Sequence, residues 1–178
     1  EIHPERFAKQ LHCLNAHPEY GLVGVRTDLF VQNNMTRSFM RTTKSPSRIQ
    51  NLSKYLLCSN PFSHGAIMFR TSSFFLAGGY NEKVKIAQDL DLYFRISQRA
   101  SLFIIDEILN KHTFHRNGTT LSNNRKSVIS GIKIRLKYMR FRKLTYFGFW
   151  LGLVRDLIFL LIPVRLLAIL RTRNVQYL

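Results

Sequence analysis

Two aspartates, Asp89 and Asp91, stand two residues apart at the start of a helical pattern. The apolar residues Leu90, Tyr93 and Phe94 follow at the spacing that one face of a helix requires. A carboxylate in this position could act as a general base that accepts a proton from a hydroxyl group. Asp89 could instead cap the helix, because the exposed N–H groups of a first turn favour a negative charge. The pattern by itself leaves both interpretations open.

A pair of glycines precedes this helix. Gly78 and Gly79 carry no Cβ, so they predict a tight turn or a close approach of the backbone to a ligand. A short helix capped by Thr71 is expected to end at this turn. Tyr80 follows the turn, and we expect it to shape the floor of a pocket together with the glycines. Arg95 is expected on the solvent-facing side of the second helix.

Residues 78–82 (GGYNE) and 88–95 (QDLDLYFR) resemble the second half of an inverting family 2 glycosyltransferase of the GT-A fold. In that family a loop of the form GGY(D/N)E is followed by (E/Q)DxDLxxR. Residues 60–70 (NPFSHGAIMFR) resemble the family's strand that is approached through Asn-Pro and a histidine. Residues 4–10 and 17–24 resemble the helix and strand that follow the family's metal-binding Asp-x-Asp motif.

The resemblance implies a reaction and a catalytic residue. A sugar would pass from a nucleotide-sugar donor to an acceptor hydroxyl with inversion, in the synthesis of a polysaccharide, glycolipid or cell-surface glycan. The acceptor would be a glycan or a lipid-linked molecule. Asp89 falls on the position of the family's catalytic base, and Gln88 stands where the family more often has Glu. Asp91 faces another side of the helix and is expected to position or cap.

The resemblance also implies a divalent metal, Mg²⁺ or Mn²⁺, that neutralises the leaving nucleoside diphosphate. The aspartates that hold this metal in the family correspond to positions before Glu1, and we expect the metal ligands there. The first half of the catalytic domain is expected there too. The isolated chain is therefore predicted not to transfer sugar.

Eight residues are predicted by this resemblance to bind substrate: His64, Gly79, Tyr80, Gln88, Asp91, Arg95, His115 and Arg116. His64 precedes a predicted strand and either lines the acceptor side or has a structural role. His115 and Arg116 stand where the family often has an Arg or His that reaches the diphosphate, although their order departs from the usual pattern. Arg116 could clamp a phosphate with its forked donors, or it could be a solvated loop residue.

The composition is strongly basic, with 27 Lys and Arg against 10 Asp and Glu and a net charge of +17. This excess predicts an anionic partner, which could be nucleic acid, a membrane surface or a phosphorylated substrate. No nucleic-acid-binding signature accompanies the charge, so we expect no nucleic-acid partner. Cys13 and Cys58 do not make a disulfide framework, and both are expected to be buried free thiols.

The C-terminal part joins a basic run to an apolar run. Residues 125–143 carry eight basic and no acidic residues, and residues 146–170 are almost wholly apolar. The charged residues within the apolar run leave no stretch long enough for a spanning helix. We expect helices that lie in the interface of an anionic membrane, which places the protein peripherally on the cytoplasmic face. Packing on the missing half or on another subunit, and a true span, are the alternatives.

Strand and helix patterns alternate along the chain, which predicts an α/β protein. The resemblance makes it a partial GT-A fold, a Rossmann-like nucleotide-diphospho-sugar transferase fold, with C-terminal helices. We expect two parts, the half-domain at residues 1–122 and a helical tail at residues 123–178. The predicted helices cover residues 4–17, 46–58, 72–77 and the segment after Asp89. The predicted strands cover residues 21–25, 66–70, 102–105 and 108–114, with a long loop or weak hairpin at residues 26–44.

Overall fold

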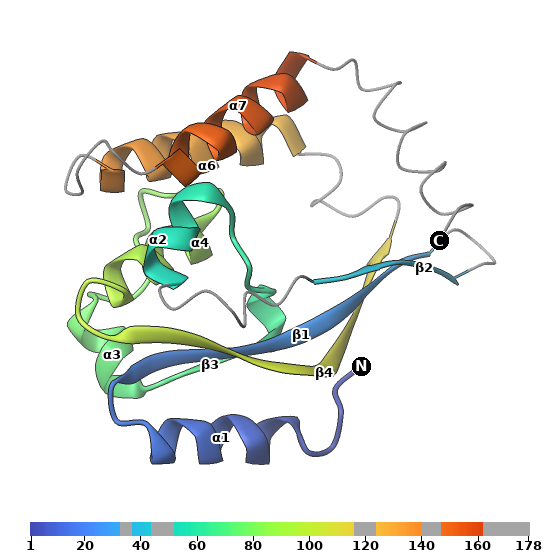
Figure 1. The fold of residues 1–178 in the computed structure, drawn as a ribbon, viewed down its shortest axis with the longest axis vertical. Coiled ribbons are helices and arrows are strands. Elements are labelled where there is room, and N and C mark those ends of the chain that lie inside the picture. Colours follow the sequence, from blue (N-terminus) through green and yellow to red (C-terminus); the bar gives the residue numbers. More distant parts are fainter. Residues whose placement is uncertain (33–36, 44–51, 116–123, 140–146, 162–178) are drawn as a thin grey trace.

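The computed structural model describes residues 1–32, 37–43, 52–115, 124–139 and 147–161. The described elements are, in chain order, α1 (Arg6–Ala16), β1 (Tyr20–Gln32), β2 (Arg37–Thr42), α2 (Leu52–Cys58), the short 3-10 helix η1 (His64–Ala66), β3 (Ile67–Phe69), α3 (Thr71–Leu76), α4 (Gln88–Ile96), β4 (Ser101–His115), α6 (Asn124–Met139) and α7 (Phe147–Leu161) (Figure 1). Helices and strands alternate around one mixed sheet, which confirms the predicted α/β class and the C-terminal helices.

The long strand β1 is the centre of the sheet. Strand β4 runs parallel to it along nearly its whole length. On its other side, β1 pairs antiparallel first with β3 at Leu22–Gly24 and then with β2 at Asp28–Gln32. The strand predicted at residues 21–25 is therefore much longer. Of the two structures predicted for residues 26–44, the hairpin is correct.

The two strands predicted at residues 102–105 and 108–114 form one continuous strand, β4. Its register against β1 shifts where Val25 pairs with Ile105 and Arg26 with Ile108. The two acidic residues between them, which belonged to neither predicted strand, lie on β4 instead. Asp106 is bound by Arg26 at 3.1 Å, and Glu107 is bound by a lysine of α1 at 2.6 Å. At the predicted break the structure thus has a register shift within one strand, and both acidic side chains form ion pairs with neighbouring elements.

Helix α1 covers one face of the sheet, and α2 and α4 cover the other (Figure 1). Helix α1 begins at Arg6, two residues after the start that Pro4 predicted. It ends at Ala16, before Pro18, as predicted. Helix α2 begins at Leu52 in the described residues, and the start predicted near residue 46 lies outside them. Cys13 and Cys58 are free thiols as predicted, but both are only half-buried.

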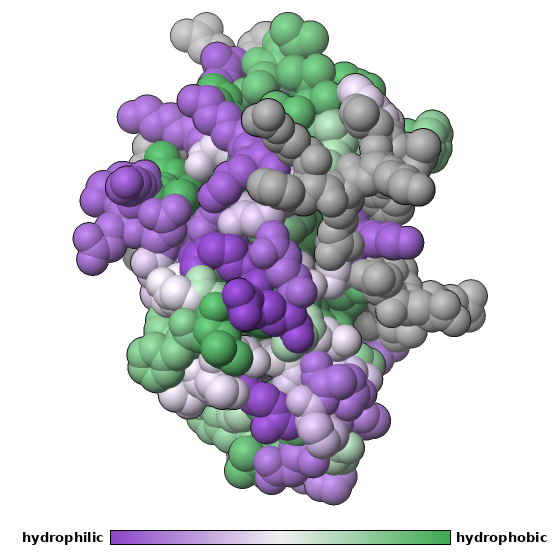
Figure 2. Space-filling view, turned by 90° about the vertical axis from the view of Figure 1, so that its left-hand side faces the viewer, coloured by the Kyte–Doolittle hydropathy of each residue, from purple (hydrophilic) through white to green (hydrophobic). Residues whose placement is uncertain are grey.

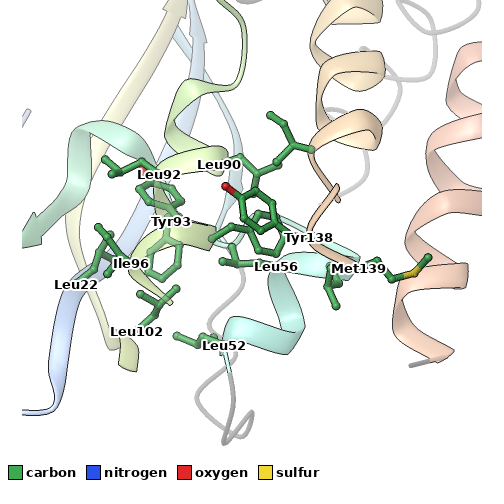
Figure 3. Packing of buried hydrophobic residues seen from close by; sticks show 14 of the residues in the cluster. Leu22, Leu52, Leu56, Leu90, Leu92, Tyr93, Ile96, Leu102, Tyr138 and Met139 are labelled. Atoms are coloured by element: carbon green, nitrogen blue, oxygen red, sulfur yellow. The ribbon is translucent and has the colours of Figure 1, made fainter. Parts of the chain in front are cut away.

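The main core lies between the sheet and the helices that cover its second face (Figure 3). Leu22 of β1, Leu56 of α2 and Leu92 of α4 are fully buried there. Full burial of such a side chain stabilises the fold by about 1.5–3 kcal/mol relative to exposure. Tyr138 of α6 stacks on Phe94 of α4, with 4.7 Å between ring centroids. Helix α4 is therefore enclosed on two sides, which explains why six of its nine residues are buried.

The C-terminal helices pack on the rest of the chain. Gly152 of α7 lies so close to α2 that an added Cβ would meet the carbonyl oxygen of Cys58 at 2.5 Å. Arg135 of α6 is buried and binds Asp156 of α7. The expectation that the basic run faces lipid is therefore wrong for Arg135. The predicted packing alternative named a missing half or another subunit, whereas the structure shows α2 of the same chain. Among the described residues, no helix is both long and apolar enough to cross a membrane.

Candidate active site

The glycine turn lies where α3 ends. Gly78 and Gly79 have φ angles of 77° and 63°, in the left-handed region that favours glycine. The turn predicted from the two glycines is therefore confirmed. Helix α3 begins at Thr71 itself, and Arg70 occupies the capping position without a side-chain hydrogen bond. The cap predicted for Thr71 is wrong.

Asp89 is the second residue of α4, and its side chain is half-buried. The helix is preceded by Ala87 at the capping position, in the left-handed region with φ of 61°. Asp89 is therefore not the helix cap. Within the described part of the chain, its carboxylate accepts a long hydrogen bond of 3.4 Å from Nδ2 of Asn60. The other carboxylate oxygen, Oδ1, has no such partner among these residues, so it can accept a proton from a bound molecule.

Asn60 is held in place by its own local structure. Its Oδ1 accepts a hydrogen bond from the backbone N–H of Phe62 at 3.1 Å, which is the Asx turn that Asn-Pro sequences favour. This bond directs the amide Nδ2 toward Asp89. Asn60 was not predicted as a site residue, although it begins the Asn-Pro segment on which the resemblance rests.

His64 lies between two tyrosine hydroxyl groups. Its Nδ1 is 2.9 Å from the Tyr93 hydroxyl, and its Nε2 is 3.3 Å from the Tyr80 hydroxyl. A neutral imidazole carries one proton on its two nitrogens, so one tyrosine donates to the ring and the other accepts from it. Tyr93 is fully buried and Tyr80 is 40% exposed. The hydrogen-bonded row Tyr93–His64–Tyr80 therefore leads from the core to the surface.

Asp89 acts on both tyrosines through its charge. Burial raises the pKa of Tyr93, and the negative charge of Asp89 raises it further. The same two causes, burial first, raise the pKa of Tyr80. Both hydroxyl groups consequently keep their protons at neutral pH and can donate hydrogen bonds. His64, Tyr80 and Asp89 are thus three predicted site residues that the fold brings together.

Tyr93 was predicted as a core residue and not as a site residue. It stands four positions after Asp89, so the two side chains lie on the same side of α4. That spacing is the signal that could have identified it. Its ring packs edge-on against Phe62 at 5.2 Å between centroids, which fixes the hydroxyl beside His64.

The segment that carries His64 is fastened to α1. Arg6 donates a hydrogen bond to the carbonyl oxygen of Gly65 at 2.8 Å. Gln10 donates to the carbonyl oxygens of Val23 and Ala66 at 2.9 and 3.2 Å. Arg6 and Gln10 are buried polar side chains that satisfy backbone carbonyl groups of η1 and of β1. Helix α1 therefore positions His64 from the opposite face of the sheet.

Asp91 belongs to a second cluster. Its side chain is fully buried and accepts hydrogen bonds from Arg95 Nε at 2.9 Å, the Tyr138 hydroxyl at 3.0 Å and Lys137 Nζ at 3.3 Å. Arg95 also donates to the carbonyl oxygens of Ala77 and, at 2.6 Å, Gly79. The expectation that Arg95 faces solvent is wrong, because the side chain clamps the glycine turn to α4. The predicted substrate contacts of Asp91 and Arg95 stay predictions.

The remaining predicted site residues are more distant or lie outside the description. Gln88 is the exposed first residue of α4. His115 ends β4 opposite Gln32, whereas β3 pairs with β1 at Gly24. Gly24 and Gln32 are eight residues apart on the extended strand β1, which corresponds to roughly 26 Å. The backbone therefore places His115 far from the Asp89 cluster. Arg116 lies outside the described residues.

No metal site is found in the described residues, because no group of three or more His, Cys, Asp or Glu side chains there could hold an ion. The prediction that the ligands stand upstream of Glu1 stays a prediction. A groove of about 520 Å³ lies between α1 and β4, lined by residues that include Lys9, Cys13 and Glu107. It adjoins the helix on the opposite face of the sheet from α4 and is separate from the Asp89 cluster (Figure 1).

Comparison with known proteins reveals a similarity to a curated protein. No protein-family model matches the chain. Over 93 residues, 52% of its length, it is 29% identical to the amylovoran biosynthesis glycosyltransferase AmsE of Erwinia amylovora. The chain is distantly similar to a glycosyltransferase. The match covers 33% of AmsE, so the chain corresponds to about a third of that relative's length.

Proposed function

We propose that this chain is the acceptor-side part of an inverting family 2 glycosyltransferase of the GT-A fold, with Asp89 as the general base. The observation that carries the proposal is the half-buried carboxylate of Asp89, which accepts a hydrogen bond from the amide of Asn60 and whose charge raises the pKa of Tyr80 and Tyr93. The distant similarity to AmsE supports a sugar-transfer reaction in polysaccharide synthesis. The donor would be a nucleotide-sugar, and the acceptor a glycan or lipid-linked hydroxyl.

In this reaction Asp89 would accept the proton of the acceptor hydroxyl through Oδ1 while Asn60 holds Oδ2. The hydroxyl oxygen would attack the anomeric carbon opposite the diphosphate. One C–O bond forms as the bond to the diphosphate oxygen breaks, and the configuration inverts. Tyr80, exposed at the end of the hydrogen-bonded row, would orient a neighbouring hydroxyl of the acceptor.

The divalent metal of the resemblance would neutralise the leaving diphosphate. The described residues do not form a site for it, so we assign none of them to metal binding. His115, which the backbone places far from the Asp89 cluster, and Arg116, which lies outside the described residues, stay predictions and receive no role in this proposal. Gly79 and Gln88 are proposed to line the acceptor pocket because they flank the Asp89 cluster in the chain.

Replacement of Asp89 by Asn in the full-length protein tests the proposed base. Turnover of the nucleotide-sugar should fall by about 10²–10⁴-fold, the usual contribution of a general base. The melting temperature should change little, because the carboxylate has one long hydrogen bond. The matched control is Asp106→Asn, which removes an exposed carboxylate on β4 outside the cluster. Wild-type turnover in the Asp89→Asn variant would contradict the assignment.

A second candidate function is a basic binding module without catalysis, which the net charge of +17 favours. Such a module would hold nucleic acid or a membrane surface through the C-terminal helices. Retention of the chain by nucleic acid at physiological salt, together with no turnover of a nucleotide-sugar by the full-length protein, would favour this candidate over the enzyme.

A further inference from the structure

Helix α7 has two different faces. One face is buried against the rest of the chain through Phe149, Gly152 and Asp156. The other face exposes seven large apolar side chains, between 44% and 82% accessible: Phe147, Trp150, Leu151, Val154, Leu157, Ile158 and Leu161. We call these seven residues the α7 stripe. They recur every three or four residues, so they form one continuous band along the helix.

The α7 stripe is long and uninterrupted. A helix of 15 residues extends about 22 Å, and the stripe begins and ends with its first and last residues. Figure 2 shows hydrophobic residues gathered at the upper end of the molecule, where Figure 1 places α7. Contiguous apolar surface of this kind marks an interaction site more often than scattered exposed residues do.

Positive charge is concentrated on the helix that packs beside α7. Helix α6 packs beside α7, contains no acidic residue and carries exposed Arg125, Lys126, Lys133 and Lys137. The single acidic residue of α7, Asp156, is buried between Arg135 and Arg155. Neither helix therefore presents an exposed carboxylate, and the combination of an apolar band with basic side chains fits a surface that is apolar inside and anionic outside.

We propose that the α7 stripe docks on an anionic lipid bilayer, with the apolar side chains at the acyl boundary and the α6 lysines at the phosphate groups. Trp150 would lie at the headgroup level, where indole rings are favoured. A second copy of the chain fits less well, because pairing two stripes would bring together two molecules of net charge +17. The proposal concerns binding alone and stands independently of the proposed catalysis.

The test measures co-sedimentation of the chain with vesicles of phosphatidylcholine, with and without phosphatidylglycerol. Binding should require the anionic lipid and weaken as salt rises. Leu151→Glu should reduce the affinity by about tenfold or more, because it removes apolar contact and adds a negative charge. The matched control is Leu11→Glu on α1, because Leu11 and Leu151 are both 53% exposed. The control should bind almost as the original chain does.

A second pair of variants tests the charge. Lys133→Gln on α6 should weaken binding about fivefold, since one basic side chain near an anionic surface contributes about that factor. The control Lys85→Gln removes an exposed charge between α3 and α4. Lys137 is unsuitable because it also binds Asp91.

Equal losses for Leu151→Glu and Leu11→Glu, or no binding to anionic vesicles, would overturn the proposal. Dimerisation in analytical ultracentrifugation that Leu151→Glu abolishes, without any vesicle binding, would assign the stripe to a second copy and overturn it equally. Circular dichroism of each variant shows whether the fold is intact. Because both leucines are exposed, we expect both variants to keep the fold.

Discussion

Asp89 and Asp91 stand two residues apart on α4 and occupy opposite environments. Asp91 is fully buried and accepts hydrogen bonds from Arg95, Lys137 and Tyr138. Asp89 is half-buried, and in the described part of the chain it accepts one long bond from Asn60. The same chemical group thus has a saturated site on one side of the helix and an open site on the other.

The difference separates holding the fold from doing chemistry. The carboxylate of Asp91 accepts hydrogen bonds from donors of α4 and α6, so it joins these helices. Few of its acceptor positions remain for a substrate. Asp89 keeps an oxygen that a bound hydroxyl can reach. The arrangement also links the two sites, because Arg95 fastens the glycine turn that precedes Tyr80.

The largest expected effect on stability comes from Asp91→Ala. It leaves the partly buried guanidinium of Arg95 without its ion-pair partner, so the free energy of unfolding should fall by about 3–5 kcal/mol. Urea denaturation measures this loss. Asp89→Ala should cost less than about 1 kcal/mol, because a half-buried carboxylate with one long bond contributes little. Similar losses in the two variants would remove the distinction between the sites.

The next largest effect should come from Tyr138→Phe. Its hydroxyl donates to the buried Asp91 carboxylate, and hydrogen bonds to charged groups contribute about 1.5–3 kcal/mol. Denaturant unfolding at neutral pH measures the loss. The control is Tyr93→Phe, which removes a hydroxyl bonded to the His64 ring and should cost about 0.5–1.5 kcal/mol. A larger loss for Tyr93→Phe than for Tyr138→Phe would reverse the comparison.

The raised pKa of Tyr138 also predicts that the stability of the protein depends on pH. Burial, followed by the charge of Asp91, raises the pKa of Tyr138 in the folded protein. Because the folded pKa lies above the unfolded value near 10, its contribution to stability is complete below about pH 10 and is lost as the pH rises. Relative to the Tyr138→Phe variant, the wild-type chain should lose at most about 1.4 kcal/mol per pH unit there. A constant difference across alkaline pH would contradict the prediction.

A smaller effect is expected at the glycine turn. Gly79→Ala places a Cβ on a left-handed residue and should cost about 1–2 kcal/mol, measured by thermal unfolding. Its Cβ would have ordinary contacts of 3.4 Å with Phe74, so the cost is conformational. Gly65→Ala is the control, because an added Cβ there meets no atom within 4 Å and the backbone is not left-handed. It should be nearly neutral, and an equal loss would show that the φ angle is not the cause.

The smallest effect is electrostatic. Asp89→Asn removes a negative charge that raises the pKa of Tyr80, so this pKa should fall. A ¹³C NMR titration of the tyrosine rings measures the change. Asp91→Asn should leave the pKa of Tyr80 where it is, because the Asp91 carboxylate faces the other cluster. A shift of Tyr80 in both variants would mean that the clusters are electrically connected.

Local patterns in the sequence were sufficient for several of these elements. The glycine pair predicted the left-handed turn because no other residue adopts that backbone without cost. The spacing of Leu90, Tyr93 and Phe94 predicted α4, and Pro18 predicted the end of α1. Each of these signals acts within a few residues, so the rest of the fold was not needed to interpret it.

Other features depended on partners that are distant in the chain. The sequence predicted two strands separated at Asp106 and Glu107, whereas pairing with β1 forms one strand with a register shift there. The helical spacing predicted that Arg95 faces solvent. In the structure its guanidinium donates instead to Asp91 and to the carbonyl oxygen of Gly79. Spacing alone does not identify a partner that is formed by another element.

The sequence by itself determined the turn, the helix that carries both aspartates and the distant similarity to a glycosyltransferase, because these depend on neighbouring residues. Only the tertiary structure decided which aspartate is open. Asp91 became structural because α6, more than 40 residues along the chain, brings Lys137 and Tyr138 to it. Asp89 stayed accessible because the element on its side, the segment at Asn60, offers it one amide. A carboxylate's environment is set by the groups that folding brings around it, and adjacent identical residues can therefore have opposite roles.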